Sequence, residues 1–194
     1  MASSYSWIDD FPAQITAEEY EALPEEFCAT IEVIDGHIVK CESPSRLHNR
    51  VALNLAVAFK ENRKPEPCLM VDTDIDVRIT DAPLNVRQSD VTVSRCLPDN
   101  QRLYTRDVVL VVEVVSPDSS LKTDTVEKKA AYADAGIRVY LIVFLNAAKD
   151  GVDRIEEYWL DPTGSYRLVQ LHTRRLTLTE PIPVNIPFTD LSAI

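Results

Sequence analysis

The stretch 107-DVVLVVEVVSPDSS-120 contains a run of β-branched apolar residues that stops at Ser116-Pro117. A continuous apolar run of this length predicts a strand that is covered on both faces of its sheet. Glu113 interrupts the run, and a buried carboxylate is costly unless it is paired with a cation or binds a metal. Glu113 is therefore a structural acid in an ion pair, an acid on the wet face of a short edge strand, or a metal ligand.

The bulk composition describes a globular chain. The 194 residues fit one domain with a sizeable core, and 45% of them are hydrophobic and 26% charged. No apolar run approaches the roughly 18 residues of a transmembrane helix. Residues 1–14 carry acids where a signal peptide would carry bases, so we expect a cytoplasmic protein without membrane contact.

The charge balance narrows the class of partner. A net charge of -11 disfavours broad, non-specific affinity for nucleic acid, which depends on Lys and Arg neutralising phosphates. It leaves a local basic groove open, and clustered acids suit divalent cations. The four cysteines are widely spaced and form no Cys-x-x-Cys pair, so we expect free thiols and no disulfide frame or zinc site. They are Cys28, Cys41, Cys68 and Cys96.

The N-terminal part predicts a short helix, a hairpin and a longer helix. The sequence 16-TAEEYEAL-23 opens with a capping box and is ended by Pro24. Residues 29–42 alternate apolar and polar side chains around Asp35-Gly36, which is a strong signal for a two-residue turn. Residues 49–63 carry an apolar stripe at helical spacing.

The rest of the chain predicts strands and one further helix. The helix covers 122–136, with Asp124 as its cap and Gly136 at its end. The proline-rich residues 181–188 should be irregular or edge-like. The expected strands are 69–79, 86–94, 107–115, 138–145, 154–160 and 165–172. This order predicts a mixed α/β fold (α+β) in one domain over residues 1–194.

Two acids fall opposite each other in the predicted sheet. A hairpin of strands 86–94 and 107–115 pairs Asp90 with Glu113. Directly opposed residues have Cβ atoms about 5 Å apart. Carboxylates at that separation repel unless a cation or a shared proton lies between them. A register slip of one residue would move one of the two side chains to the other face.

The helix that follows brings a cation toward these acids. Lys128 shares a helix face with Asp124 and Tyr132. Beside two carboxylates, a lysine can hold a water or hydroxide and stabilise the charge that develops on a phosphoryl group. The simpler alternative is an Asp124–Lys128 ion pair at i,i+4 spacing.

A second row of acids lies on the first predicted strand of the sheet. Asp72, Asp74 and Asp76 alternate along 69–79, so their side chains share one strand face. The row resembles a cation-binding row, although a solvated edge is the simpler explanation.

The order of the polar residues resembles the Uma-two family, bacterial endonuclease-like proteins of the PD-(D/E)XK, restriction-endonuclease-like superfamily. The resemblance covers roughly residues 16 to 170. Its most specific part is 113-EVVSP-117 with an Asp-x-x-x-Lys-x-x-x-Tyr helix behind it. The other matching positions are Glu32 with Asp35-Gly36, Pro44-Ser45, His48, Asp90 and Gly136.

The resemblance implies a role for each matching position. Asp90 and Glu113 would hold the metal, and the carbonyl group of Val114 would add a ligand. Lys128 would replace the superfamily's usual lysine, because the Glu-x-Lys position here is Val115. The resemblance also places two further site residues, Glu32 and His48, near the metal.

The resemblance further implies a fold and an activity. The fold would be a restriction-endonuclease-like core α-β-β-β-α-β over about 49–145, with an N-terminal β-hairpin and extra C-terminal strands. This order matches the elements expected from the residue patterns. The implied activity is Mg²⁺- or Mn²⁺-dependent hydrolysis of DNA phosphodiester bonds, and oxygen ligands without thiolates favour such hard cations. Nucleases of this superfamily that cut both strands are often paired, so a homodimer is an expectation too.

Three positions depart from the family's pattern. Ser89 precedes Asp90 where a proline is usual, and because that proline is a backbone feature its loss should not remove the metal site. The last core strand usually reads Tyr-Trp-x-Val-Asp, but Leu141 and Phe144 stand here for the tryptophan and the aspartate. The alternative function is therefore a catalytically degraded nuclease fold that serves as a nucleic-acid or protein interaction module. RNA cleavage is a further alternative, because the chemistry at phosphate is the same.

Overall fold

A computed structural model describes residues 14–41, 43–117 and 123–194 of the chain. Its helices are α1 (Ala17–Glu21), α2 (Glu25–Cys28), α3 (Arg46–Asn62), a π-helical turn (Thr123–Lys128) that continues into α4 (Lys129–Asp134), and α5 (Phe188–Ser192). A short 3₁₀ turn covers Thr105–Asp107. The strands are β1 (Ile31–Ile34), β2 (His37–Lys40), β3 (Leu69–Asp81), β4 (Leu84–Arg95), β5 (Val108–Val115), β6 (Val139–Leu145), β7 (Val152–Leu160), β8 (Tyr166–His172), β9 (Arg175–Leu178) and β10 (Val184–Pro187).

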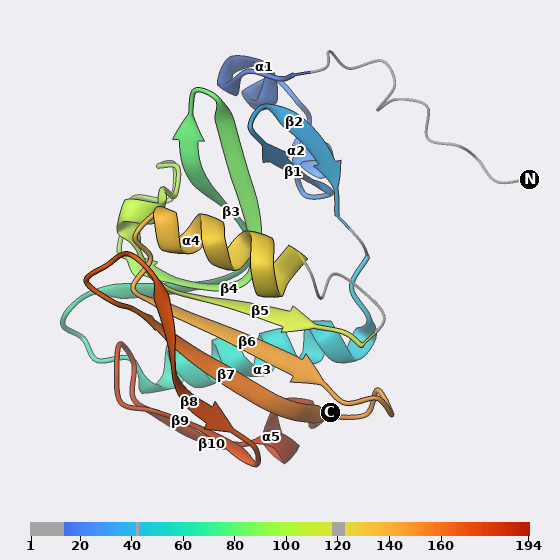
Figure 1. Ribbon diagram of the computed structural model, residues 1–194, viewed down its shortest axis with the longest axis vertical. Coiled ribbons are helices and arrows are strands. Elements are labelled where there is room, and N and C mark those ends of the chain that lie inside the picture. Colours follow the sequence, from blue (N-terminus) through green and yellow to red (C-terminus); the bar gives the residue numbers. More distant parts are fainter. Residues whose placement is uncertain (1–13, 42, 118–122) are drawn as a thin grey trace, which may run out of the picture.

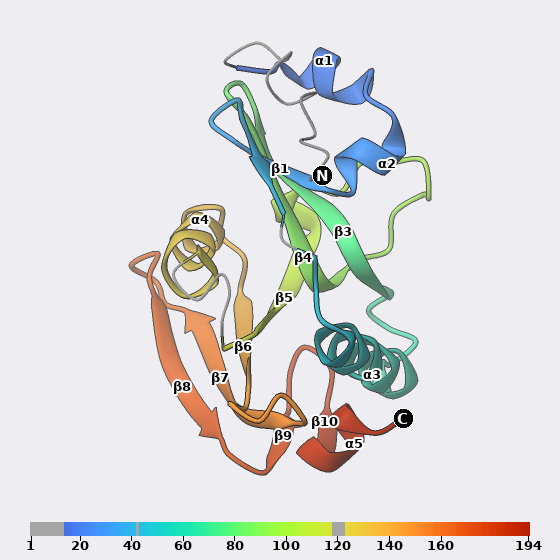
Figure 2. The ribbon, with the colours of Figure 1, turned by 90° about the vertical axis from the view of Figure 1, so that its right-hand side faces the viewer.

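The described strands form a curved mixed sheet between two helices. Its order is β2-β1-β4-β5-β6-β7-β8, with β3 paired to β4, and β9 and β10 form a separate ribbon. Strands β5 and β6 pair in parallel, and the other named neighbours are antiparallel. Figures 1 and 2 show α3 and α4 on opposite sides of the sheet. The order α3-β3-β4-β5-α4-β6 confirms the predicted restriction-endonuclease-like core.

Three apolar clusters hold these layers together. The largest lies between α3 and the sheet and includes Leu55 and Phe59 of the helix. The second lies under α4 around Tyr132 and Tyr140, whose rings meet edge to face. Strand β5 contributes alternate residues to both clusters, which is why its sequence is apolar on both faces. The third cluster packs α1 against the β1–β2 hairpin.

The N-terminal predictions are confirmed with small differences. The capping box of α1 is present, and Asp35 and Gly36 adopt φ of 51° and 84° in the hairpin turn. A one-turn helix, α2, follows Pro24 where no helix was expected. Helix α3 begins earlier than predicted because the Ser45 side chain accepts a hydrogen bond from the amide of His48.

The second half of the chain differs more from its prediction. The helix expected over 122–136 is π-helical over its first described turn, and Gly136 follows it with φ of 79°. The expected cap by the Asp124 side chain lies outside what the structure describes. Strands β9 and β10 form a short antiparallel ribbon at the C-terminal end. No strand was expected at β9, and β10 lies within residues 181–188, where irregular or edge-like chain was expected. None of the described helices is both long and apolar enough to cross a membrane.

The prediction of four free thiols is wrong for one pair. Cys68 and Cys96 form a disulfide, with their Cα atoms 5.5 Å apart. They flank Leu69 and Arg95, which pair directly between β3 and β4. Strand register, and not spacing along the chain, therefore brings the two thiols together. Cys28 and Cys41 are free.

Loss of this disulfide should lower stability measurably. The bond closes a loop with a sequence separation of 28 residues. Constraint of the unfolded chain by a loop of that length contributes about 3 to 4 kcal/mol. We expect the double variant Cys68→Ala/Cys96→Ala to lose about this much unfolding free energy in urea. The matched variant Cys28→Ala/Cys41→Ala should lose less, and the reverse order would contradict the assignment.

Candidate active site

The register of strands β4 and β5 places Asp90 beside Glu113. Val91 pairs with Val112 and Thr92 with Val111, so Asp90 and Glu113 follow at the next step of the ladder. This register is the predicted one. The two carboxylates nevertheless have different partners, because one contacts α3 and the other contacts the helical segment before β6.

Asp90 links the start of α3 to the end of β5. Its Oδ1 lies 2.9 Å from Nε2 of His48, and its Oδ2 accepts a hydrogen bond of 2.6 Å from the amide of Val114. His48 reaches this position because the Ser45 cap places it in the first turn of the helix. Both acid and imidazole are partly buried, with side chains 17% and 13% exposed.

Glu113 is held from the other side of the sheet. Its side chain is 2% exposed. Its Oε2 lies 2.9 Å from Nζ of Lys128, and its Oε1 accepts a hydrogen bond of 3.0 Å from the Tyr132 hydroxyl. Burial, reinforced by the charge of Glu113, raises the pKa of Tyr132 well above its ordinary value. The phenol therefore stays protonated and acts as a donor to Glu113.

Lys128 joins this acid to a second buried carboxylate. Its Nζ lies 2.9 Å from Oε1 of Glu32 on β1 and donates a hydrogen bond of 2.7 Å to the carbonyl of Gln88. Glu32 also accepts from the amide of Gln88 at 3.0 Å and from Arg87 at 3.2 Å. The Lys128 side chain is only 10% exposed, and its amine is thus fixed between Glu113 and Glu32.

The charged groups of this cluster are buried, so they interact strongly with one another. Glu32 and Glu113 carry negative charge, Arg87 and Lys128 carry positive charge, and all four are buried. Charge pairs in such a setting interact far more strongly than they do in water. The Nε of Arg87 is buried with no hydrogen-bond partner in the described parts of the chain. Arg87 therefore serves mainly as a charge partner of Glu32.

Two further polar groups border the cluster. Burial raises the pKa of the Cys41 thiol to about 12, with Glu32 as the next cause, so this thiol is no nucleophile at neutral pH. Asp74 on β3 lies close enough to Asp90 that its pKa is raised, first by burial and then by that charge. The sequence showed Asp74 only as part of an alternating row, and gave no sign that its neighbour would be Asp90.

The structure brings together the residues predicted for the site in two groups. One consists of Asp90, His48 and the amide of Val114, and the other of Glu32, Glu113 and Lys128. Glu113 is a paired acid in the strand interior, and Lys128 is its cation. The remaining contributions of Arg87 and Gln88 depend on the β1–β4 contact, which no spacing in the sequence reveals.

The donor chemistry of these residues fits a hard divalent cation. The set consists of carboxylates, a carbonyl and an imidazole, which suits Mg²⁺ or Mn²⁺. In the arrangement described for residues 14–41, 43–117 and 123–194, no group of three or more His, Cys, Asp or Glu side chains is placed to hold a metal. Asp90 and Glu113 instead bind protein donors.

Phe144, on β6, stands where the family pattern has an aspartate, and its surroundings in the structure are apolar. Phe144 is 6% exposed, and the guanidinium of Arg154 lies 3.7 Å from its ring centroid. Leu141 is fully buried in the core under α3. Both residues therefore contribute packing at the end of β6.

The fold and the buried Glu–Lys cluster define a protein of the restriction-endonuclease-like class. The chain resembles the crystal structure of a putative nuclease belonging to DUF820 from Anabaena variabilis, with a TM-score of 0.67 and 16% sequence identity. The match covers 91% of this chain and 97% of that one. No curated protein gave a significant sequence match.

The family follows from the sequence itself. Residues 17–189 match the Uma2 family, described as "putative restriction endonuclease". The match spans most of the chain, so this protein belongs to the Uma2 family. The resemblance inferred from 113-EVVSP-117 and the lysine helix is thereby confirmed.

Proposed function

We propose that this protein is a divalent-metal-dependent endonuclease that hydrolyses DNA phosphodiester bonds. The observation that carries the proposal is the amine of Lys128, fixed 2.9 Å from both Glu113 and Glu32 at the end of β5. Apolar residues of similar volume often stabilise a fold as well as a buried ion pair does. Stability alone therefore does not explain why a buried lysine lies between two acids next to the Asp90–His48 pair. Family membership supports the same reading.

The chain's acids would hold the metal. We assign this role to Asp90, Glu113 and the carbonyl of Val114. A bound Mg²⁺ or Mn²⁺ supplies Lewis acidity toward phosphate and lowers the pKa of water. Asp90 and Glu113 lie on adjacent strands, one step beyond the Val91–Val112 pair of the ladder. To share one ion, both carboxylates would have to turn toward it from their present protein donors.

The other residues would position the reaction without binding the ion. Lys128 donates hydrogen bonds and offsets negative charge on the phosphoryl group. Glu32 and the carbonyl of Gln88 hold the lysine amine, so it does not have to be ordered when substrate arrives. His48, fixed by Asp90, places an imidazole at the opposite side of the site.

The remaining parts of the proposal concern partners and place. DNA is the substrate we assign, in keeping with the description of the Uma2 family. A homodimer would place two such sites on the two strands of a duplex. We further propose a cytoplasmic location.

The test is calorimetric titration with Mn²⁺, followed by incubation with supercoiled plasmid. We expect wild-type protein to bind Mn²⁺ and the double variant Asp90→Ala/Glu113→Ala to lose binding. Glu61→Ala, which removes an exposed acid of α3 at a distance from the site, is the control and should bind as wild type. Undiminished affinity in the double variant would overturn the metal assignment.

A second candidate function rests on Phe144 and Leu141. Because both are buried apolar residues, the chain lacks the acid that the family usually has on this strand. A non-catalytic nucleic-acid or protein interaction module is the alternative they favour. Stable folding, no Mn²⁺ binding and no effect of Lys128 variants on any nucleic-acid interaction would select it. Cleavage of ribonucleotide substrates in place of deoxyribonucleotide substrates would instead identify RNA as the substrate.

A further inference from the structure

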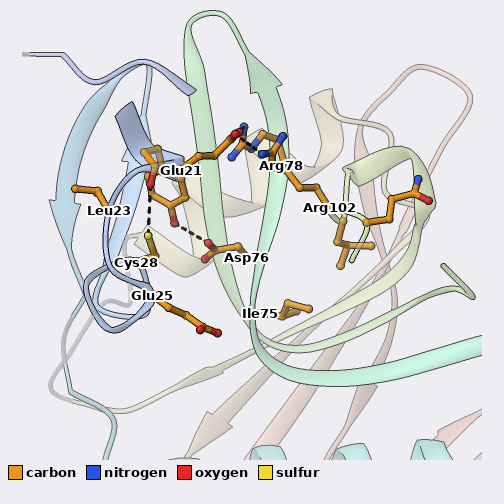
Figure 3. Close-up of a pocket in the computed structure, with 11 residues that line it drawn as sticks. Glu21, Leu23, Glu25, Cys28, Ile75, Asp76, Arg78 and Arg102 are labelled. Atoms are coloured by element: carbon orange, nitrogen blue, oxygen red, sulfur yellow. Dashed lines mark hydrogen bonds and ion pairs between the residues drawn. The ribbon is translucent and has the colours of Figure 1, made fainter. Parts of the chain in front are cut away.

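A separate pocket lies between β3, residues 101–103 and the segment that carries α1 and α2. Its volume is about 370 Å³, within the usual range for small-molecule sites. Figure 3 shows Asp76 of β3 in this pocket, with Glu25 of α2 at its edge. Leu23, Ile75 and Leu103 contribute apolar wall. Asp76 is the one member of the alternating acid row on this strand that lines the pocket.

The charges of the pocket wall do not balance internally. Arg78 is buried, and its guanidinium is paired with Asp81 at 3.0 Å and with Glu21 at 3.4 Å. Arg102 forms its ion pair with the same Glu21. Both arginines are thus already neutralised by acids that line the pocket or lie beside it.

Two other carboxylates in the wall, Asp76 and Glu25, take no part in these ion pairs. Asp76 is half-buried and accepts a hydrogen bond of 2.6 Å from the Tyr20 hydroxyl, which is neutral. Burial raises the pKa of Asp76, so the charged form is poorly stabilised there although Arg78 lies near. Across the described residues, no ion pair joins Asp76 or Glu25 to a basic side chain. The half-buried Asp76 would be stabilised by a cation from outside, and the exposed Glu25 offers that cation a second carboxylate.

The wall also indicates which kind of cation fits. A hydrated Mg²⁺ needs oxygen ligands all round, whereas Leu23, Ile75 and Leu103 offer none. An organic ammonium can place its charge on a carboxylate and its alkyl chain on these side chains. An organic anion would have to displace Glu21 from two arginines while facing Asp76.

We propose that this pocket binds a short aliphatic diamine, with one ammonium group on Asp76 and the other on Glu25. The alkyl chain between them lies against the apolar wall. None of the residues of the catalytic cluster lines the pocket, so the inference does not rest on the nuclease assignment, although Glu32 lies near enough to Asp76 to raise its pKa.

Calorimetric titration of the full chain with putrescine, butylamine and butyrate tests this proposal. These probes share a four-carbon skeleton and differ in charge. We expect putrescine to bind, butylamine to bind about two- to fivefold more weakly because it lacks the contact with exposed Glu25, and butyrate not to bind. Preferential binding of butyrate would assign the pocket to anions through Arg78 and Arg102 and would overturn the proposal. Absence of putrescine binding would overturn it too.

Variants then locate the ammonium group. Asp76→Asn keeps an acceptor for the Tyr20 hydroxyl and should weaken putrescine binding about tenfold or more. Asp72→Asn, on the same strand and outside the pocket wall, is the matched control and should leave the affinity unchanged. Thermal unfolding of each variant shows that it is folded. Equal affinities of wild type and Asp76→Asn would place the amine elsewhere and refute the assignment.

Discussion

Replacing Glu113 by glutamine should reduce the rate of DNA cleavage by on the order of a thousandfold. The substitution removes one negative charge and keeps the volume and an acceptor for the Tyr132 hydroxyl. If Glu113 holds the metal, its loss withdraws the ion from the scissile phosphate, and removal of a single electrostatic contact of this kind costs about 10² to 10³ in rate. Plasmid nicking under single-turnover conditions with Mn²⁺ measures the change.

The matched control for this prediction is Glu61→Gln. Glu61 is an exposed acid of α3, so its loss changes the net charge equally without touching the cluster. It should cleave at the wild-type rate. Cleavage by Glu113→Gln within a few-fold of wild type would make Glu113 an acid that only anchors Lys128, and the activity would then require another centre.

Local signals in the sequence were sufficient for the parts of the site that lie on β4 and β5. The apolar run around Glu113 identifies a strand covered on both faces, and antiparallel pairing brings Asp90 to the next position of the ladder. The turn at Asp35-Gly36 similarly predicts the hairpin that carries Glu32. In these cases each residue's place follows from its neighbours in the chain.

Contacts between distant segments could not be predicted in this way. Arg87 meets Glu32 only because β1 pairs with β4, through Val33 and Val86. Cys68 and Cys96 meet only because β3 and β4 pair along their whole length. The prolines at 181 and 183 led to an expectation of irregular or edge-like chain, and β10 begins just after them at Val184. Its partner β9 was not predicted, because that contact joins segments that no local pattern links.

Replacing Lys128 by methionine should lower the free energy of unfolding by about 3 kcal/mol or more. Methionine fills a similar volume but leaves Glu113 and Glu32 without the amine that lies between them. Removal of one partner of a buried ion pair costs about 3 to 5 kcal/mol, because the remaining charge stays desolvated. Urea unfolding followed by circular dichroism measures the loss.

The adjacent lysine supplies the control. Lys129, which is half-buried on the same helix, places its Nζ 3.4 Å from the ring centroid of Tyr158. Lys129→Met should cost about 1 to 2 kcal/mol, the range for cation–π contacts between exposed and desolvated sites. Equal losses for the two variants would mean that Lys128 makes no special ion pair in solution.

A double variant separates the ion pair from the packing. Glu113→Gln combined with Lys128→Met removes both charges, and the pair should lose less stability than the two single changes added together. A coupling of about 1 kcal/mol or more is expected for groups in direct contact.

Lys128→Arg adds the catalytic test, because it retains the positive charge but replaces a compact ammonium with a planar guanidinium. If the lysine only balances charge, the arginine variant should keep both stability and cleavage. If it positions the nucleophile, cleavage should fall while most of the stability is retained.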